Sequence, residues 1–300
     1  MNVAWCNGEW MDPGRLSPGW RDRGWLHGLG LFETMLAIDG GVAFGGAHWE
    51  RLAEGCRRLG WEPPWLRSGM MLETAVELLE RAGLDRGEAR LRLAVSGGSG
   101  PLDDLAQGAD RMVWMTAAPL GKGPDGLAVD VSPWLRNERG PLAGLKCASY
   151  AENLVALDDA RKRGFDETLF FNCAGHLCEA ATANVFLSRG GSQGTPPLTS
   201  GCLPGVARRV ILALARREAI ACAEEDFTRE DLESAEGILL TSALRGPVAV
   251  VRCGTRALQS TVPGERLATL WRQAARESAS GQNPEDLAFP GGVCGLSSAP

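Results

Sequence analysis

The spacing of apolar residues in the first part of the chain predicts strands alternating with amphipathic helices. A tight turn at Asp39-Gly40-Gly41 favours a hairpin near the start. Strands are expected at Leu31–Ile38, Gly41–Phe44, Ala89–Val95 and Arg111–Ala117, and helices at His48–Leu59 and Met70–Ala82. This mixture indicates an α/β or α+β protein.

A second block with the same alternation follows a loop rich in glycine, Gly121–Gly126. Its expected strands are Leu127–Val131, Glu167–Phe171, Ala183–Leu187, Gly237–Thr241 and Val248–Val251, and its expected helices are Tyr150–Arg163, Val206–Ala219 and Glu265–Glu277. We therefore predict a small N-terminal α/β domain over residues 1–120, a linker over 121–126, and a larger C-terminal domain over 127–277. Residues 278–300, rich in Gly, Ser and Pro, are expected to form a flexible tail.

Composition and charge exclude several classes of function. The chain has 300 residues, a net charge of −6 and a pI near 5.3, without the basic excess of a nucleic-acid binder or a membrane-surface protein. We expect no transmembrane helix and no signal peptide, hence a cytoplasmic protein. Nine scattered cysteines predict no disulfide framework, and three histidines without zinc-ligand spacing predict no metal site.

Only three of the 31 basic residues are lysines, so any chemistry that needs a side-chain amine has only three candidate residues. Lys122 lies in the glycine-rich loop, and Lys162 lies in a charged helix end that is expected to be solvated. Lys146 stands among small and apolar residues, where a lysine either extends its ammonium group to solvent or serves a function. Burial would lower its pKa and leave a nucleophilic amine at neutral pH.

Other candidate positions each have a plain structural alternative. Glu179 is either an exposed turn residue or a carboxylate aimed at a protonated ring nitrogen. Arg51 is either a surface residue or a phosphate ligand, and the helix start after Leu203-Pro204-Gly205 is a possible anion site. The loop Ser96–Pro101 is either a mobile loop near an active site or a plain linker. Gly28-x-Gly30 lacks the third glycine of a dinucleotide-binding loop.

Taken in order, these segments resemble the class IV (fold type IV) aminotransferase family, which includes branched-chain aminotransferases, D-amino-acid aminotransferases and 4-amino-4-deoxychorismate lyase. The resemblance spans about Gly24 to Val251 and is carried by several blocks. They are Gly28–Thr34, His48-x-x-Arg51-Leu52, Lys146-x-x-Ser149-Tyr150-x-x-Asn153, Gly164–Glu167, Gly175-x-x-x-Glu179-x-x-x-Ala183-Asn184-Val185-Phe186, Thr195-Pro196-Pro197, Leu203-Pro204-Gly205 and Thr241–Leu244.

The resemblance implies a two-domain fold like that of D-amino-acid aminotransferase, with pyridoxal 5'-phosphate in the cleft between the domains. It implies that Lys146 forms a Schiff base with the cofactor and moves a proton, and that Glu179 pairs with the pyridine nitrogen. It assigns the phosphate to Arg51, the main-chain N–H groups of Val206 and Ala207, and a second turn at Thr241 and Ser242, and places Tyr150 near the phenolic oxygen. It also implies a homodimer.

One position departs from the family pattern. Many members carry threonine where this chain has Ala207, so a hydroxyl that commonly touches the phosphate is missing. A lost hydrogen bond to a charged group costs about 1.5–3 kcal/mol. We therefore expect either weaker cofactor binding or compensation by Ser242.

The reaction is less well specified than the cofactor. The leading hypothesis is 4-amino-4-deoxychorismate lyase, which releases pyruvate and forms p-aminobenzoate for folate biosynthesis. The turn Thr241–Gly246 and the strand Arg90–Leu93 favour it, and Arg92 or Arg245 is a candidate ligand for a substrate carboxylate. The alternative is a D-amino-acid or branched-chain transaminase. A third hypothesis, a non-catalytic binding protein, is disfavoured by the intact set Lys146, Glu179 and Arg51.

Overall fold

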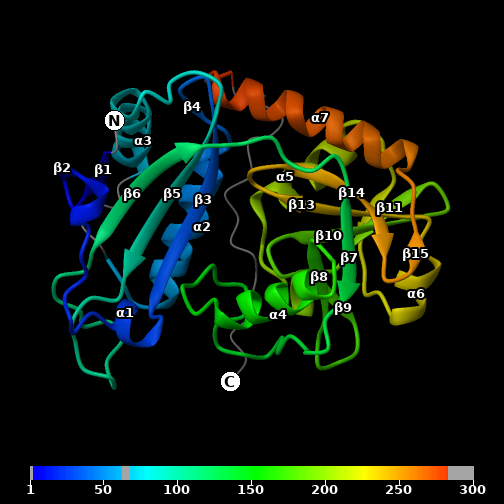
Figure 1. Cartoon of the computed structure of the whole chain (residues 1–300), viewed down its shortest axis with the longest axis horizontal. Coiled ribbons are helices and arrows are strands. Elements are labelled where there is room, and N and C mark those ends of the chain that lie inside the picture. Colours follow the sequence, from blue (N-terminus) through cyan, green and yellow to red (C-terminus); the bar gives the residue numbers. More distant parts are fainter. Residues whose placement is uncertain (1–2, 63–67, 283–300) are drawn as a thin grey trace.

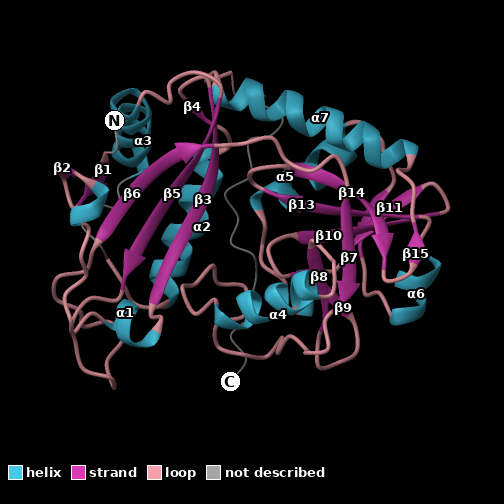
Figure 2. Cartoon of the chain, viewed as in Figure 1, coloured by secondary structure: helices cyan, strands magenta, loops and turns pink. Residues whose placement is uncertain are grey.

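The computed structural model of the chain describes residues 3–62 and 68–282. Two β-sheets lie side by side, each accompanied by helices (Figure 1). One long helix runs along the second sheet and ends beside the edge of the first (Figure 1). Strands and helices are mixed in both halves (Figure 2), which confirms the predicted α/β (α+β) class.

The first sheet has six strands within the described residues, and every neighbouring pair is antiparallel. In spatial order they are β2 (Glu9–Met11), β1 (Ala4–Cys6), β6 (Val113–Pro119), β5 (Glu88–Ser96), β3 (Gly30–Ile38) and β4 (Gly41–Val42). Strands β3 and β5 pair over their full length, from Gly30 opposite Ser96 to Ile38 opposite Glu88. Apolar and polar residues alternate in the first part of β5, so its arginines face away from the buried core.

The second sheet has nine described strands and is mixed. Eight follow the order β12 (Cys222–Glu224), β11 (Ser192–Thr195), β10 (Asn184–Arg189), β13 (Gly237–Ser242), β14 (Gly246–Cys253), β7 (Leu127–Val131), β8 (Glu167–Phe171) and β9 (Leu177–Ala180), and β15 (Arg256–Ala257) pairs with β14. Strand β7 lies parallel to both of its neighbours. All five residues of β8 are buried, the polar Glu167 and Thr168 as well as the three apolar ones, so both faces of this strand are covered.

Seven α-helices are described. They are α1 (Arg23–His27), α2 (Gly45–Arg58), α3 (Ser68–Ala82), α4 (Ala151–Lys162), α5 (Val206–Arg217), α6 (Arg229–Ser234) and α7 (Val262–Ala279). The predicted strand at Gly41–Phe44 was too long, because Phe44 adopts a left-handed conformation (φ 53°) and α2 begins at the next residue. The short elements β1, β2 and α1 were not predicted, because three to five residues carry too little periodicity.

Helix α7 connects the two halves of the structure (Figure 1). Its residues Leu267 and Trp271 share one buried cluster with Leu36 and Phe44 from the first half. The expectation that the tail begins at Ser278 was wrong. The helix continues to Ala279, and the Ser278 hydroxyl accepts a hydrogen bond of 2.9 Å from the main-chain N–H of Phe44. Residues 283–300 of the predicted tail lie outside the described residues.

The last strand of the first sheet ends at Pro119, and the first strand of the second sheet begins at Leu127. The predicted domains, 1–120 and 127–277, and the linker 121–126 between them stay predictions. The shared cluster around α7 means that the two halves are also joined through apolar packing.

A buried arginine organises the loop that follows β5. Arg23 is 2% exposed, and its guanidinium donates to the carbonyl oxygens of Gly97, Gly98, Pro101 and Asp104 at 2.8–3.3 Å. The segment Ser96–Pro101 is therefore tied to α1 by one side chain, an arrangement that neither the mobile-loop nor the linker interpretation anticipated.

Candidate active site

Lys146 is held against the start of β3 by main-chain hydrogen bonds. The N–H of Phe32 donates to the carbonyl of Lys146 at 3.0 Å, and the N–H of Ala148 donates to the carbonyl of Gly30 at 2.7 Å. Gly28 permits this approach, because it has a φ of +66° and a Cβ there would lie 2.9 Å from the Ser149 hydroxyl. Gly28 and Gly30 thus allow the segment that contains Lys146 to pack directly against the start of β3.

The side chain of Lys146 lies among aromatic rings. Its Nζ is 4.5 Å from the ring centroid of Phe32 and 5.9 Å from that of Tyr150. Burial, reinforced by the nearby Arg51 guanidinium, lowers the pKa of Lys146 to about 8. Lys122 and Lys162 are 86% and 75% exposed and pair with Asp125 and Asp158. Lys146 is therefore the lysine best suited to act as a nucleophile.

Arg51 is anchored by a buried carboxylate that received no role in the sequence analysis. Glu33, on β3, is 1% exposed and accepts from Arg51 Nε at 2.8 Å and from Arg51 Nη2 at 2.6 Å. His48 Nδ1 lies 2.7 Å from the same carboxylate. Burial alone would raise the pKa of Glu33, but the charge of Arg51 and these hydrogen bonds lower it to about 2. Glu33 therefore holds the Arg51 side chain in one position.

We expect Glu33→Gln to lower the free energy of unfolding of the apoprotein by about 3 kcal/mol at pH 7. The carboxylate is stabilised in the folded state, so its contribution is present above the ordinary pKa of 4.5 and is lost as the pH falls toward about 2. Denaturant unfolding of both proteins across this range measures the difference. A deficit that stays constant down to the lowest pH at which both fold would contradict the ionic account.

Glu179, on β9, is 13% exposed and faces a second guanidinium. Its Oε2 accepts from the main-chain N–H of Leu203 at 2.9 Å, and its Oε1 lies 3.6 Å from Arg136 Nε. Burial raises the pKa of Glu179, and Arg136 opposes that rise. The carboxylate is therefore buried and partnered, and the exposed-turn alternative for Glu179 was wrong.

Arg136 was missed by sequence reasoning, because it lies in a polar loop segment with no periodicity or motif around it. Its guanidinium stacks 4.4 Å from the ring centroid of Phe170. Its Nε and Nη2 atoms are buried and form no hydrogen bond within the described residues. Arg136 thus brings a positive charge and unused donors to the side of the site where Glu179 lies.

The Tyr150 hydroxyl donates to the carbonyl of Ala181 at 2.8 Å, and Asn153 Nδ2 donates to the same oxygen at 2.6 Å. The Tyr150 ring packs edge-on against Phe32, with 5.6 Å between centroids. Burial, with the nearby charges of Glu179 and Glu167, raises the pKa of Tyr150 to about 12. The hydroxyl therefore keeps its proton at neutral pH.

A set of unused donors gathers where α5 begins. The first N–H groups of this helix, from Val206 and Ala207, have no carbonyl partner within the helix, and no side chain caps it. Thr241 is paired in the sheet with Asn184, whose Nδ2 donates to the carbonyl of Leu203 just before the helix. The Thr241 hydroxyl is buried and has no hydrogen-bond partner within the described residues. Arg51 Nη1 donates at 3.0 Å to the carbonyl of Pro204, two residues before the helix. Helix dipole, hydroxyl and guanidinium together fit a bound phosphate.

Three further predicted positions differ in how closely they approach this site. Ser242 is half-buried and lies opposite Gly246 in the β13–β14 pair. The Arg92 guanidinium lies 4.1 Å from the ring centroid of Phe32, the same ring that Lys146 approaches. Arg245 instead packs its side chain against Gly123. The structure therefore brings Arg92, and not Arg245, to the ring beside Lys146.

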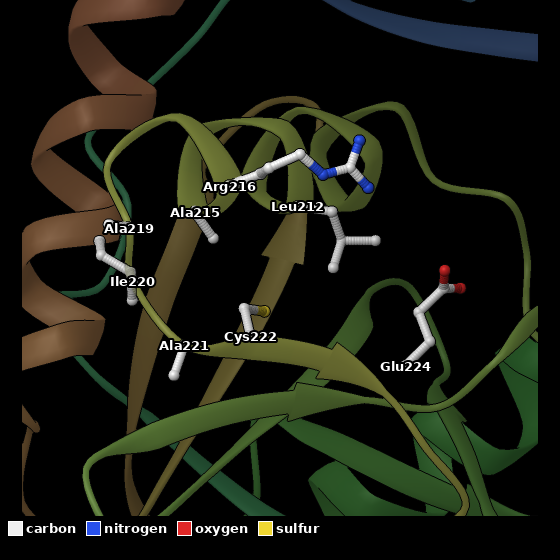
Figure 3. A pocket seen from close by; sticks show the side chains of 8 residues that line it. All are labelled: Leu212, Ala215, Arg216, Ala219, Ile220, Ala221, Cys222 and Glu224. Carbon is white, nitrogen blue, oxygen red and sulfur yellow. The ribbon is translucent and has the colours of Figure 1, made fainter.

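A cavity of about 510 Å³ lies elsewhere, at the C-terminal end of α5 (Figure 3). Leu212, Arg216, Ile220, Cys222 and Glu224 are among its lining residues, and none of the candidate site residues contributes to it. We therefore do not assign it to the active site.

No cluster of three or more His, Cys, Asp or Glu side chains suited to a metal ion occurs within residues 3–62 and 68–282. None of the described helices is long and apolar enough to cross a membrane.

Comparisons with known proteins agree with one another. The family described as Amino-transferase class IV matches residues 30–253. The bifunctional aminodeoxychorismate lyase / D-amino acid transaminase of Mycobacterium tuberculosis is 28% identical over 286 residues, which cover 89% of this chain and 96% of that protein.

Solved structures show the same relationship. The branched-chain aminotransferase of Thermoproteus uzoniensis, solved with norvaline, matches with a TM-score of 0.85 at 25% identity, over 95% of this chain and 97% of that one. The fold of a Mycobacterium tuberculosis protein described as a hypothetical aminotransferase, in its PLP-bound form, matches with a TM-score of 0.80 at 24% identity, over 91% and 98% of the two chains.

Proposed function

The chain belongs to the class IV aminotransferase family of pyridoxal-phosphate enzymes, and we propose that Lys146 is its cofactor-binding lysine. The observation that carries this proposal is the position of Lys146, whose main chain is hydrogen-bonded to the start of β3 and whose Nζ lies 4.5 Å from the ring centroid of Phe32. Burial there, with the nearby charge of Arg51, lowers the pKa of Lys146 to about 8. The other two lysines are exposed and paired with carboxylates.

The residues present fit the cofactor in three respects. A phosphate would bind at the start of α5, where the N–H groups of Val206 and Ala207, the unpartnered Thr241 hydroxyl and Arg51 provide donors. The Thr241 hydroxyl offers a donor that the methyl group of Ala207 cannot, whereas Ser242 is the next residue of the strand, where successive side chains point to opposite faces. Glu179 supplies the carboxylate for the ring nitrogen.

Bound pyridoxal phosphate supplies an aldehyde that condenses with amines and a ring that withdraws electrons from the carbon beside the nitrogen. Lys146 provides the amine that binds it and, when free, the base that accepts a proton from the substrate carbon. Glu179 holds a proton on the ring nitrogen, and Arg136 favours the charged carboxylate that this task requires. Arg92 forms no salt bridge within the described residues and is the proposed ligand for a substrate carboxylate.

The lowered pKa of Lys146 predicts how the apoprotein captures its cofactor. Only the neutral amine attacks an aldehyde, so the rate of capture should rise about tenfold per pH unit at acidic pH and level off above about 8. Stopped-flow absorbance after mixing apoprotein with pyridoxal phosphate between pH 6 and 10 measures this rate. A rate that still climbs at pH 10, as expected for an ordinary lysine, would show that the amine is not perturbed.

For the reaction itself, we propose a 4-amino-4-deoxychorismate lyase that expels pyruvate and forms p-aminobenzoate, a step of folate biosynthesis. The support comes from the Mycobacterium tuberculosis relative, whose name includes this activity and which aligns over almost its whole length. Arg92, beside Lys146, offers a guanidinium for a carboxylate of such a substrate. In this proposal Lys146 removes the proton from the carbon that bears the substrate amine.

The second candidate is a transaminase for D- or branched-chain amino acids. The fold match to the Thermoproteus uzoniensis enzyme, at a TM-score of 0.85, favours the branched-chain form, and the second activity named for the Mycobacterium tuberculosis relative favours the D-amino-acid form. In both candidate reactions Lys146 would bind the cofactor and accept the substrate proton, and Glu179 would pair with the ring nitrogen.

The visible spectrum of the holoenzyme separates the two candidates. We expect D- and L-amino acids, added singly, to leave the cofactor band unchanged, and 4-amino-4-deoxychorismate to yield pyruvate and p-aminobenzoate in equal amounts. Conversion of the band to that of the pyridoxamine form by one amino acid, with no p-aminobenzoate released, would replace the lyase by the transaminase.

We also propose that the protein works as a homodimer in the cytoplasm. Large apolar side chains are exposed on two segments that Arg23 ties together, namely Trp20, Trp25 and Leu26 around α1 and Leu102 and Leu105 in the loop after β5. Large exposed apolar side chains on neighbouring segments of this kind are typical of an interface. Light scattering should give twice the mass of one chain, and Trp25→Asp should shift it toward the monomer.

A further inference from the structure

Strand β5 carries two arginines on the face opposite its buried residues. Arg90 and Arg92 are exposed, and they alternate with the buried residues Ala89, Leu91 and Leu93. Successive side chains of a strand point to opposite faces, so the two arginines leave β5 on the same side, with their Cα atoms about 7 Å apart. Two guanidinium groups therefore stand in a row along this strand.

Arg92 stands at the end of this row that is nearest Lys146. Its guanidinium lies 4.1 Å from the ring centroid of Phe32, and Lys146 Nζ lies 4.5 Å from the same centroid. Burial and the positive charge of Arg90 both lower the pKa of Arg92. An anion bound at Arg92 would reduce that repulsion, and the proposed function gives Arg92 a substrate carboxylate.

Arg90 stands farther along the same row. In the sheet it lies opposite Leu36 on β3 and Ala118 on β6. Directly opposed residues share one face of a sheet, and Leu36 belongs to a buried cluster that includes Val206 of the second half. Arg90 therefore lies on the face that the first sheet turns toward the second half, within reach of a ligand that extends beyond the neighbouring arginine.

No carboxylate in the described part of the chain neutralises either arginine. Neither guanidinium forms a hydrogen bond or a salt bridge with a described residue. Two other arginines of the candidate site are different, because Arg51 is bound by Glu33, and Arg136 Nε lies 3.6 Å from the Glu179 carboxylate. A surface lined by one sign of charge attracts ligands of the opposite sign. The row is therefore suited to a ligand that carries two negative charges.

We propose that Arg90 and Arg92 form two carboxylate subsites, so that the substrate is a dicarboxylate with its second carboxylate on Arg90. This inference rests on the proposed function, since it assumes that the substrate amine meets Lys146 and that Arg92 binds the nearer carboxylate. A guanidinium binds a carboxylate through two parallel N–H groups, and a monocarboxylate would leave one of the two guanidiniums without a partner. The same subsites would serve either candidate reaction.

The test compares dicarboxylates with monocarboxylates of the same chain length as ligands of the holoenzyme. Succinate, glutarate and adipate are paired with butyrate, pentanoate and hexanoate, and each affinity is measured by isothermal titration calorimetry. The diacid that spans the two arginines best should bind about tenfold more tightly than its monocarboxylate, as expected for an added hydrogen bond to a charged group. No advantage for any diacid would overturn the proposal.

Arg90→Met separates the second subsite from the first, because it removes the charge and keeps most of the length of the side chain. The best diacid should bind about tenfold more weakly to this variant, and its monocarboxylate should bind within about twofold of the wild type. Arg92→Met should weaken the binding of both acids, and Arg90→Lys should restore part of the preference for the diacid. An Arg90→Met variant that weakens both acids equally, or neither, would contradict the second subsite.

Arg86→Met is the matched control, because Arg86 is exposed just before β5 and its loss changes the net charge by the same amount. It should leave the affinity for both acids unchanged. If Arg86→Met lowers the affinity for the diacid as much as Arg90→Met does, the preference comes from net charge alone and the proposal falls.

Cofactor capture by the wild type separates this inference from the function on which it rests. If the wild type captures no pyridoxal phosphate, the proposed function fails. If it captures the cofactor but shows no preference for a diacid, that function stands and the subsite at Arg90 falls. A preference that is lost in Arg90→Met supports the subsite whether or not p-aminobenzoate is released.

Discussion

Lys146→Ala is expected to abolish turnover and the visible band that the bound cofactor gives in the wild type. The variant lacks the amine that binds the cofactor and the base that accepts the substrate proton, and a positioned acid–base group alone is worth about 10²–10⁴-fold in rate. The measurement is the absorption spectrum of the purified variant after incubation with pyridoxal phosphate, together with kcat for the best substrate.

Lys122→Ala and Lys162→Ala are matched controls, since both side chains are exposed and paired with carboxylates on the surface. Each should keep the wild-type spectrum and kcat. A visible band that survives in Lys146→Ala but disappears in one of the controls would move the covalent attachment to that lysine.

Glu179→Gln should retain the cofactor but lower kcat by about 10²–10³-fold, the range found when one preorganised electrostatic partner is removed. Glutamine cannot carry the negative charge that keeps a proton on the ring nitrogen, although it can still accept from the N–H of Leu203. The spectrum reports retention of the cofactor, and steady-state kinetics reports the loss.

Glu54→Gln serves as the control for this substitution, because Glu54 is 52% exposed and pairs with Arg57 in the same helix. It should leave kcat unchanged. Near-normal turnover in Glu179→Gln would contradict the role assigned to that carboxylate. It would indicate that another residue pairs with the ring nitrogen.

Long periodic elements were predictable from sequence, and short or irregular ones were not. The strand Leu127–Val131 agrees with β7 residue for residue, and the helix predicted at Met70–Ala82 lies within α3. In contrast, the end of α7 was misplaced because Ser278 looks like a tail residue in sequence. Its hydroxyl is used by Phe44, far away in the chain, and such long-range bonds leave no local pattern.

The residues of the candidate site likewise divide into those that the sequence predicted and those that it did not. Lys146 was identifiable because lysines are scarce here and its neighbours are small and apolar, and the helix start at Val206 was identifiable from Pro204-Gly205. Arg136 was not, because its importance comes from the distance of 3.6 Å between its Nε and the Glu179 carboxylate and from donors that have no partner in the described part of the chain. Glu33 lay inside a recognised block, yet its role appears only when β3 and α2 bring it to Arg51.

The central claim is that Lys146 carries the cofactor, and borohydride reduction of the holoenzyme followed by peptide mass mapping tests it directly. Reduction fixes the cofactor on the amine that holds it. We predict that the phosphopyridoxyl mass appears on the peptide containing Lys146 and at no other site in stoichiometric amount. Its appearance on Lys122 or Lys162, or on no lysine of a protein saturated with pyridoxal phosphate, would contradict the account.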